Sequence, residues 1–272
     1  MSIDLSHLAA LLRETAAEEI LPRWQQVQAR HKGDGSLVTE TDIASQRRIA
    51  DALARDFPEI PLLGEEMSAE EQERVIANTP GSFWALDPLD GTSNYANGFP
   101  FFAISLALIE NGAPVLGIVL DPTRDECFCA AKGQGATLND RPLRVSAQQT
   151  RLTECIAVVD LKRIPTSRIA GLFRPGGFGS QRNIGSVALD WCWLASGRFQ
   201  LYLHGGQKLW DYAAGRLVAD EAGAATRLFG KGGTQAESTS NLAPRLAIAA
   251  ANQGLLDAWL AFVDLPPTGA DG

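Results

Sequence analysis

A pair of aspartates at the end of one apolar run constrains this chain more than any other feature. Asp87 and Asp90 follow the apolar residues 83–86 and lie three positions apart. Gly91 and Thr92 come next and can open a helix, so two carboxylates and free backbone N–H groups would lie side by side. Carboxylates bind hard divalent cations, and the N–H groups at a helix start bind phosphate. The sequence therefore predicts a cation and phosphate site at the end of a strand.

The composition is that of an ordinary globular protein with enough length for a packed core. Of the 272 residues 45% are hydrophobic, and the mean hydropathy is −0.05. The longest apolar stretch, Phe99–Ile109, contains Pro100 and Ser105 and is shorter than the ~20 residues that span a bilayer. Residues 1–4 lack the basic and apolar regions of a secretory signal. We therefore expect a cytoplasmic protein without a membrane partner.

The charge balance argues against a nucleic-acid partner. The net charge is −8, and Lys and Arg form no cluster of the kind that binds a phosphate backbone. An acidic protein that binds a phosphate needs positive charge in its site, which bound cations supply. The cysteines lie in apolar surroundings and are expected to be reduced, buried thiols. They are Cys127, Cys129, Cys155 and Cys192.

Hydrophobic periodicity predicts two helices, then a strand-rich region, then an alternation of helices and strands. The first two helices carry apolar residues at helical spacing, and a polar turn at 31–36 separates them; these residues are Leu8, Leu11, Leu12, Ala16, Ile20 and Trp24, then Ile43, Ile49, Leu53 and Phe57. Strands are predicted at 60–63, 101–109, 115–120, 126–131, 155–159, 179–183 and 199–203. Further helices are predicted at 69–76, 167–173, 186–195 and 210–222. This order indicates layered sheets and helices in one α/β (α+β) unit over 1–272.

Three further acids lie at the ends of predicted elements. Glu65 follows the strand 60–63, Asp211 opens the helix 210–222, and Asp42 lies where the second helix begins. Each acid taken alone could be a helix cap, an exposed loop residue or a turn former. Brought together, like charges would raise one another's pKa and destabilise the fold unless cations bound between them. Oxygen ligands without His or Cys favour Mg²⁺ over Zn²⁺.

Five short segments resemble the motifs of the inositol monophosphatase family. They are Val38–Asp42, Gly64–Glu66, Asp87–Asn94, Arg182–Ser186 and Trp210–Gly215. The resemblance implies a single-domain α/β/α/β/α sandwich of the sugar-phosphatase type. Its N-terminal α+β half, about 1–150, would carry most metal ligands. Its C-terminal α/β half would span about 151–263. The Pro/Gly-rich residues 264–272 predict a flexible tail.

The resemblance also implies a role for each residue of the acidic site. Two or three Mg²⁺ ions would be held by Glu65, Asp87, the Leu89 carbonyl, Asp90 and Asp211. The N–H groups of Gly91 and Thr92 would hold the phosphate. Glu65 and the Thr92 hydroxyl, polarised by Asp42, would orient the attacking water and take its proton as the catalytic residues. Lithium sensitivity and a homodimer are implied as well.

The resemblance defines the substrate less closely than the chemistry. Contacts to a small phosphorylated substrate are implied for Asp90, Gly185, Ser186, His204 and Asp211. Inositol-selective members commonly carry a carboxylate where this chain has His204, so a broader polyol or sugar phosphate is expected; His204 could equally be an ordinary polar loop residue. The alternative substrates are fructose 1,6-bisphosphate, and 3′-phosphoadenosine 5′-phosphate or histidinol phosphate, which Asp34–Ser36 faintly favours. A non-catalytic regulatory binding protein on the same fold is the remaining alternative.

Overall fold

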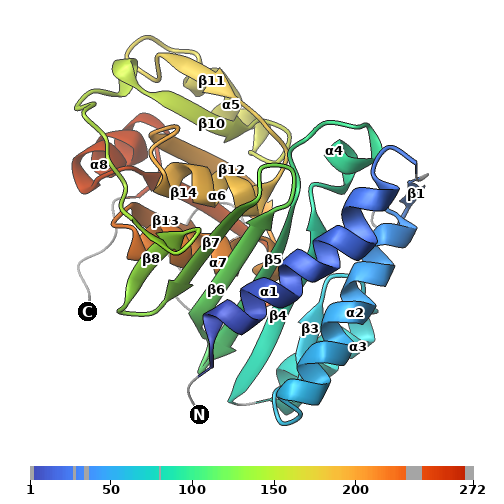
Figure 1. Ribbon diagram of the computed structural model, residues 1–272. Helices are drawn as coiled ribbons and strands as arrows, with labels where there is room; N and C mark the ends of the chain where they lie inside the picture. Colours follow the sequence, from blue (N-terminus) through green and yellow to red (C-terminus); the bar gives the residue numbers. More distant parts are fainter. Residues whose placement is uncertain (1–2, 27–28, 34–36, 80, 231–240, 267–272) are drawn as a thin grey trace.

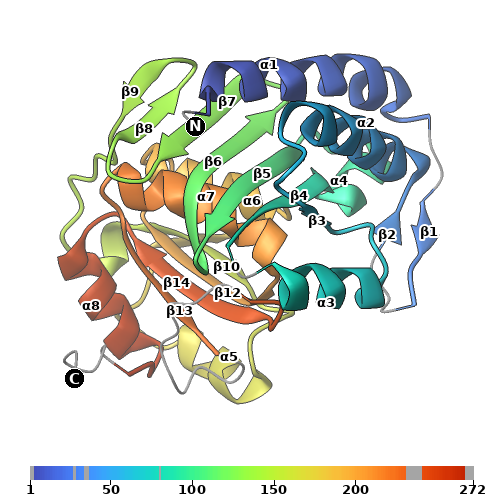
Figure 2. The same cartoon turned by 90° about the horizontal axis from the view of Figure 1, so that it is seen from below.

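The computed structural model describes residues 3–26, 29–33, 37–79, 81–230 and 241–266. Helices and sheets alternate in five layers, which Figures 1 and 2 show from two sides. Helices α1 (Leu5–Thr15) and α2 (Glu40–Asp56) cover one face of a seven-stranded sheet. Helices α6 (Val187–Ala195) and α7 (Leu209–Glu221) lie between it and a five-stranded sheet, whose far face α8 (Gln253–Phe262) covers. The predicted α/β/α/β/α sandwich is confirmed.

The seven-stranded sheet is almost entirely antiparallel. Its spatial order follows the chain from β3 to β9, and only β3 and β4 pair in parallel. The bounds are β3 Leu62–Gly64, β4 Ser82–Asp90, β5 Ala103–Glu110, β6 Ala113–Asp121, β7 Glu126–Ala131, β8 Gly135–Leu138 and β9 Arg141–Leu143. Because β3 and β4 run side by side in the same direction, Glu65 and the acids of β4 emerge at one edge of the sheet.

The five-stranded sheet mixes both directions. Its order is β11-β10-β12-β14-β13, with β10 parallel to β11 and β12, and β14 antiparallel to β12 and β13. The bounds are β10 Ile156–Asp160, β11 Ser180–Arg182, β12 Leu201–Gln207, β13 Ala225–Phe229 and β14 Arg245–Ala250. The parallel strands β10 and β12 therefore end close together, where Asp160 and His204 are register partners.

The period of two along each strand divides its side chains between two layers. In β4, Trp84 packs with the α1 and α2 layer, while Phe83 packs with α6 and α7. In β12, Leu203 packs on the α8 side and Tyr202 faces α6 and α7. Each sheet is buried on both faces, which explains why its strands read as nearly continuous apolar runs.

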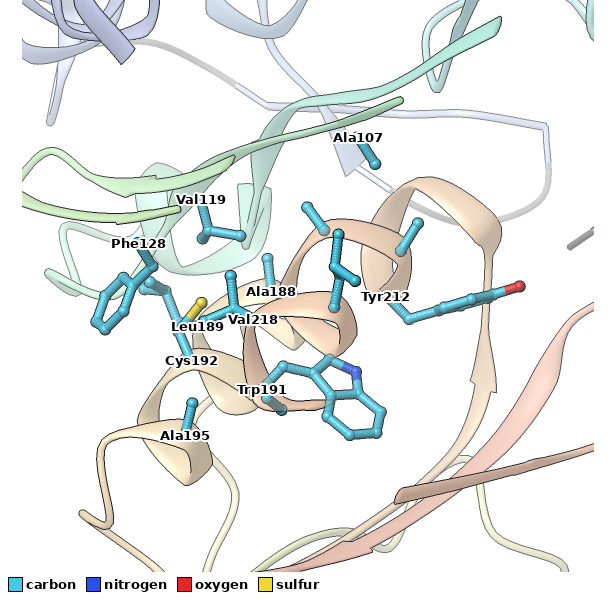
Figure 3. Packing of buried hydrophobic residues seen from close by; sticks show 14 of the residues in the cluster. Ala107, Val119, Phe128, Ala188, Leu189, Trp191, Cys192, Ala195, Tyr212 and Val218 are labelled. Atoms are coloured by element: carbon cyan, nitrogen blue, oxygen red, sulfur yellow. The ribbon is translucent and has the colours of Figure 1, made fainter. Parts of the chain in front are cut away.

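Close backbone packing fixes α7 against both neighbours. A Cβ atom on Gly117 of β6 would lie 2.8 Å from the carbonyl oxygen of Ala214 in α7. A Cβ atom on Gly215 would lie 2.8 Å from the carbonyl oxygen of Ala188 in α6. Figure 3 shows the side chains of this layer, with α6 and α7 packed together against the seven-stranded sheet. Glycine at these two positions lets α7, and with it Asp211, pack closely against the sheet on one side and against α6 on the other.

The structure differs from the predicted first two helices in two details. After α1 the chain continues as a π-helical turn, Ala16–Ile20, and a 3₁₀ turn, Leu21–Arg23. A π-helical turn holds more residues than an α-helical turn. Ile20, at the end of this turn, is buried like Leu8 and Leu12 of α1. The second helix is present as predicted, but Ile43 is 57% exposed, unlike the buried Ile49 and Leu53. One apolar residue at helical spacing does not fix the buried face.

Smaller elements complete the fold. They are β1 Arg30–His31 paired with β2 Leu37–Val38, α3 Ala69–Asn78, α4 Thr92–Ala96 and α5 Thr166–Leu172. Within the described ranges no helix has both the length and the apolar character needed to cross a membrane. The four cysteines are free thiols, of which Cys129 alone is partly exposed. The predicted tail 264–272 lies outside the described residues from position 267 onward.

Candidate active site

A cavity of about 600 Å³ lies where several strands end and several helices begin. Every residue expected to bind metal, phosphate or substrate lines it; they are Glu65, Asp87, Leu89, Asp90, Gly91, Thr92, Gly185, Ser186, His204 and Asp211. Asp42 lies behind Thr92 and does not line the cavity. The structure therefore brings together residues that are far apart in the sequence.

The end of β4 bends so that its acids face the cavity. The pairing of β4 with β5 shifts register between Asp87 and Asp90. Oδ1 of Asp87 accepts a hydrogen bond of 2.9 Å from the N–H of Leu89, which closes a tight turn. Gly91 then takes a positive φ of 96°, and a Cβ atom there would lie 3.0 Å from the carbonyl oxygen of Phe101. Glycine is required at this point, where the chain turns from strand into α4.

Thr92 connects α4 to the start of α2. Its Oγ1 lies 3.0 Å from Oδ1 of Asp42 and 3.1 Å from the carbonyl oxygen of Leu89. Asp42 is the third residue of α2, and its Oδ2 accepts a hydrogen bond of 2.8 Å from the N–H of Thr39. This capping box holds the carboxylate in place. Burial raises the pKa of Asp42, although its hydrogen bonds with Thr39 and Thr92 oppose the shift.

Asp90 bonds to the start of α6. Its Oδ2 accepts hydrogen bonds from the hydroxyl of Ser186 and, at 2.7 Å, from the N–H of Ala188. The amide of Asn94 joins the same two segments, since its Nδ2 donates to the carbonyl oxygens of Phe101 and Ile184 at 2.7 and 2.8 Å. Hydrogen bonds therefore join the Asp87–Asn94 segment to the segment around Ser186.

The buried acids repel one another. Burial raises the pKa of Asp87 well above its ordinary value, and the neighbouring charges of Glu65, Asp90 and Asp211 raise it further. The pKa of Asp211 is raised in the same way. Burial raises the pKa of Asp90 to about 6, although its hydrogen bonds to Ser186 and the α6 backbone oppose the shift. The ionised forms of these carboxylates need a compensating positive charge.

A lysine supplies part of that charge. Nζ of Lys32 lies 3.0 Å from Oε1 of Glu65 and 2.6 Å from Oε1 of Glu66. Burial alone would lower the pKa of Lys32, but the two glutamates outweigh burial and raise it. Burial raises the pKa of Glu66 to about 7, against the opposing hydrogen bond from Lys32. Lys32 was not among the residues predicted from sequence.

The carboxylates on this cavity are ligands suited to a hard cation, although their side chains are not arranged around one in this structure. Among the described residues, no group of three His, Cys, Asp or Glu side chains is placed to hold a metal ion as it lies. Glu65 turns toward Lys32, and Oδ2 of Asp211 accepts a hydrogen bond of 2.8 Å from the N–H of Lys208. The set nevertheless consists of carboxylates with raised pKa values, and carboxylate oxygens are the ligands that hard divalent cations prefer.

Two more acids, which the sequence predictions missed, line the cavity. Asp160 ends β10 and pairs with His204, whose Nε2 lies 3.1 Å from its Oδ2. Asp190 lies one turn into α6 and is 2% exposed. The sequence held signals for both. Asp160 follows an apolar strand as Asp87 does, and Asp190 is the one charged residue in Val187–Ala195. The Asp34–Ser36 segment lies outside the described residues.

The model of the inositol monophosphatase family matches residues 4–262. The chain belongs to the inositol monophosphatase family. The match covers all five sequence motifs and both sheets, so the resemblance read from the motifs is confirmed.

Similar proteins in this family carry different names: some are called inositol monophosphatases and others Nus factor SuhB. Inositol monophosphatase 1 of Solanum lycopersicum is 37% identical over 243 residues, which is 86% of this chain and 85% of that protein. The Nus factor SuhB of Pasteurella multocida is 34% identical over 207 residues, 74% of this chain and 75% of that protein. The solved IMPase of Thermotoga maritima is 29% identical, with a TM-score of 0.79 and 96% of each chain covered.

Proposed function

We propose that this protein is a magnesium-dependent phosphatase that hydrolyses a phosphate monoester of a small polyol or sugar. The observation that carries the proposal is that one cavity is lined by the buried carboxylates of Asp87 and Asp90 and by the partly buried carboxylates of Glu65 and Asp211. Repulsion among these acids makes the cavity a site for cations, and a phosphate would follow them. Membership of the inositol monophosphatase family supports the same reaction class.

Two or three magnesium ions would be held by Glu65, Asp87, the Leu89 carbonyl, Asp90 and Asp211. When bound, magnesium supplies charge neutralisation for the phosphate and lowers the pKa of a coordinated water. The N–H groups of Gly91 and Thr92, at the start of α4, would donate to the phosphate oxygens. The binding energy of the phosphate would then come from both the cations and the backbone.

The chain's own residues would move the proton of the attacking water. The Thr92 hydroxyl lies between Asp42 and the Leu89 carbonyl and can pass a proton to Asp42 as it accepts one from water. Burial prepares Asp42 for this role because its raised pKa makes it a stronger base than an exposed aspartate. Glu65 would break its contact with Lys32 and then orient the water.

The substrate proposal is a polyol or sugar phosphate contacted by Asp90, Gly185, Ser186, His204 and Asp211. Fructose 1,6-bisphosphate, histidinol phosphate and 3′-phosphoadenosine 5′-phosphate remain the alternative substrates. A purely regulatory role is the other alternative, for which the name of the SuhB relative gives a reason. The complete acid set and the Thr92–Asp42 contact favour catalysis, since a binding protein would need neither. A homodimer, implied by the family resemblance, is part of the proposal, as is the cytoplasmic location expected from the sequence. Light scattering that gives a monomer mass would remove the homodimer.

Phosphate release from a panel of substrates tests the proposal. The panel holds inositol 1-phosphate, fructose 1,6-bisphosphate, histidinol phosphate, 3′-phosphoadenosine 5′-phosphate and 2′-AMP, each with magnesium and with a chelator. Asp90→Asn should abolish turnover while Asp257→Asn, an exposed aspartate on α8, should leave it unchanged. Equal rates in the two variants would contradict the metal assignment. Magnesium binding without turnover of any substrate would favour the regulatory role.

A further inference from the structure

Two cysteines of β7 lie together on a part of the sheet that the proposed reaction does not use. Cys127 and Cys129 alternate with Phe128, which packs in the layer of α6 and α7 (Figure 3). Because alternate side chains of a strand point to opposite faces, both cysteines face the α1 side of the sheet. Neither of them lines the cavity of the acidic site. A function of this pair would therefore be separate from the hydrolysis proposed above.

The two thiols are in direct contact. Their Sγ atoms lie 3.7 Å apart, so that one thiol donates a weak hydrogen bond to the other. Cys127 is 3% exposed, whereas Cys129 is partly exposed. Solutes can therefore reach the pair from the side of Cys129. The hydrogen bond with Cys129 lowers the pKa of Cys127; burial opposes this shift, and the charge of Arg13 adds to it. Cys127 therefore forms a thiolate more readily than a buried thiol would alone.

The regular pairing of β7 keeps the two thiols from forming a disulfide. β7 pairs with both β6 and β8 without a shift of register. At the usual rise of an extended strand, the Cβ atoms of alternate residues are about 6.7 Å apart. The Cβ atoms of a disulfide are only about 3.8 Å apart. The Cβ–Sγ bonds can lean inward far enough for contact between the sulfur atoms, but an S–S bond would require the strand to bend.

The same spacing suits a cation that bridges the two sulfur atoms. A tetrahedral zinc ion with Zn–S bonds of about 2.3 Å holds two thiolates about 3.8 Å apart, so the sulfur atoms would hardly move. Two thiolates also neutralise a divalent charge, which lets the ion lie partly buried. Thiolate sulfur prefers soft cations to the hard cations that carboxylates bind. The pair therefore differs in its choice of metal from the acidic cavity.

We propose that Cys127 and Cys129 form a two-thiolate site for a soft divalent cation, zinc or cadmium. Two metal–sulfur bonds form on binding, and the thiol protons pass to solvent. Within the described ranges no third His, Cys, Asp or Glu side chain is placed to hold the same ion, so water completes its coordination on the exposed side of Cys129. The charge of Asp140 acts on both thiols and adds attraction for a cation, while the opposing charge of Arg13 is paired with Asp125.

Cadmium titration of the full chain tests the site. Excess magnesium competes for the carboxylates of the acidic cavity, and a phosphine reductant keeps the thiols reduced without binding the metal as a thiol reductant would. The wild type should bind one cadmium ion with the ultraviolet charge-transfer band of cadmium–thiolate bonds. Cys129→Ala should weaken this binding by about 100-fold or more, since even the loss of an outer-shell partner costs up to that factor. The matched control is Cys155→Ala, which removes a buried thiol elsewhere and should bind cadmium as the wild type does.

X-ray absorption of the zinc-loaded wild type needs no variant. With one equivalent of zinc and excess magnesium, the spectrum should show two sulfur neighbours at about 2.3 Å from the metal. Fewer than two sulfur neighbours would overturn the proposal, and so would equal cadmium affinities of the wild type and Cys129→Ala. Neither measurement needs turnover, so the proposal stands or fails independently of the phosphatase reaction.

Discussion

Thr92 and Asp42, fifty positions apart in the sequence, meet with Thr92 Oγ1 3.0 Å from Asp42 Oδ1. The contact joins the first turn of α4 to the first turn of α2. It places a buried carboxylate one hydrogen bond behind the hydroxyl that faces the cavity. A proton taken up by the hydroxyl therefore has an acceptor ready.

Substitutions of Thr92 test whether its hydroxyl transfers a proton or whether the side chain only packs. Thr92→Val keeps the shape but removes the hydroxyl, so we expect kcat to fall by about 10²–10⁴-fold, the usual contribution of general acid–base catalysis. Thr92→Ser keeps the hydroxyl and should retain most activity. Steady-state kinetics with magnesium would measure both. Similar rates for the two variants would show that the hydroxyl takes no part in the reaction.

Magnesium should stabilise the folded protein because it relieves the repulsion among Asp87, Asp90 and Asp211. A ligand that binds only the native state at one hundred times its Kd adds about 2.7 kcal/mol to the free energy of unfolding. Calorimetry with magnesium and with a chelator should show a Tm higher by several degrees in magnesium. Asp90→Asn should narrow this difference, and its metal-free Tm should not fall below that of the wild type. An unchanged Tm in magnesium would count against a native cation site.

The close approach of α7 to the sheet predicts a large effect from one methyl group. In Gly117→Ala the new Cβ atom would lie 2.8 Å from the carbonyl oxygen of Ala214, so α7 must shift. We expect about 1–3 kcal/mol less stability, as for an overpacked core, and reduced activity because α7 carries Asp211. The matched control is Gly81→Ala, where no described residue other than its chain neighbours has an atom within 4 Å of the added carbon. Urea unfolding of both variants would measure the difference, and equal stabilities would contradict the packing.

The buried imidazole of His204 predicts how stability depends on pH. Burial lowers its pKa in the folded protein, against the attraction of Asp160 and with the repulsion of Arg163. The unfolded chain therefore binds this proton at a higher pH, and stability is lost as the pH falls below about 6.5. Between pH 8 and pH 5.5 the wild type should lose up to about 1.4 kcal/mol more than His204→Gln. Denaturant titrations at the two pH values would measure this, and parallel losses would refute the assignment.

Sequence was a good guide where one local pattern sets the structure. The Asp87–Asn94 segment combines an apolar strand, two acids and a glycine that must take a positive φ, and the structure has each of these features. The family resemblance implied the five layers, and the family match confirms that resemblance. The metal and phosphate roles of these residues stay predictions, although the cavity brings all of them together.

Sequence was a poor guide where a partner comes from elsewhere in the chain. Lys32 carries no local sign that it bonds to Glu65 across the fold. Ile43 fits the helical repeat of α2, yet its side chain is 57% exposed. The pairing of Asp160 with His204 depends on the register of two strands that α5 and α6 separate in the sequence. Such contacts depend on tertiary packing, which the repeat of one segment does not encode.

The position of α7 between the two sheets has a consequence for how the protein folds. Asp211 comes from the start of α7, while Asp87 and Asp90 come from a sheet that the chain completes much earlier. Neither the first sheet alone nor the later half alone holds all of the acids. The proposed catalysis therefore requires α7 to be docked on the first sheet. Recovery of phosphatase activity after dilution from denaturant would time that docking step, whereas far-ultraviolet circular dichroism would report the formation of secondary structure.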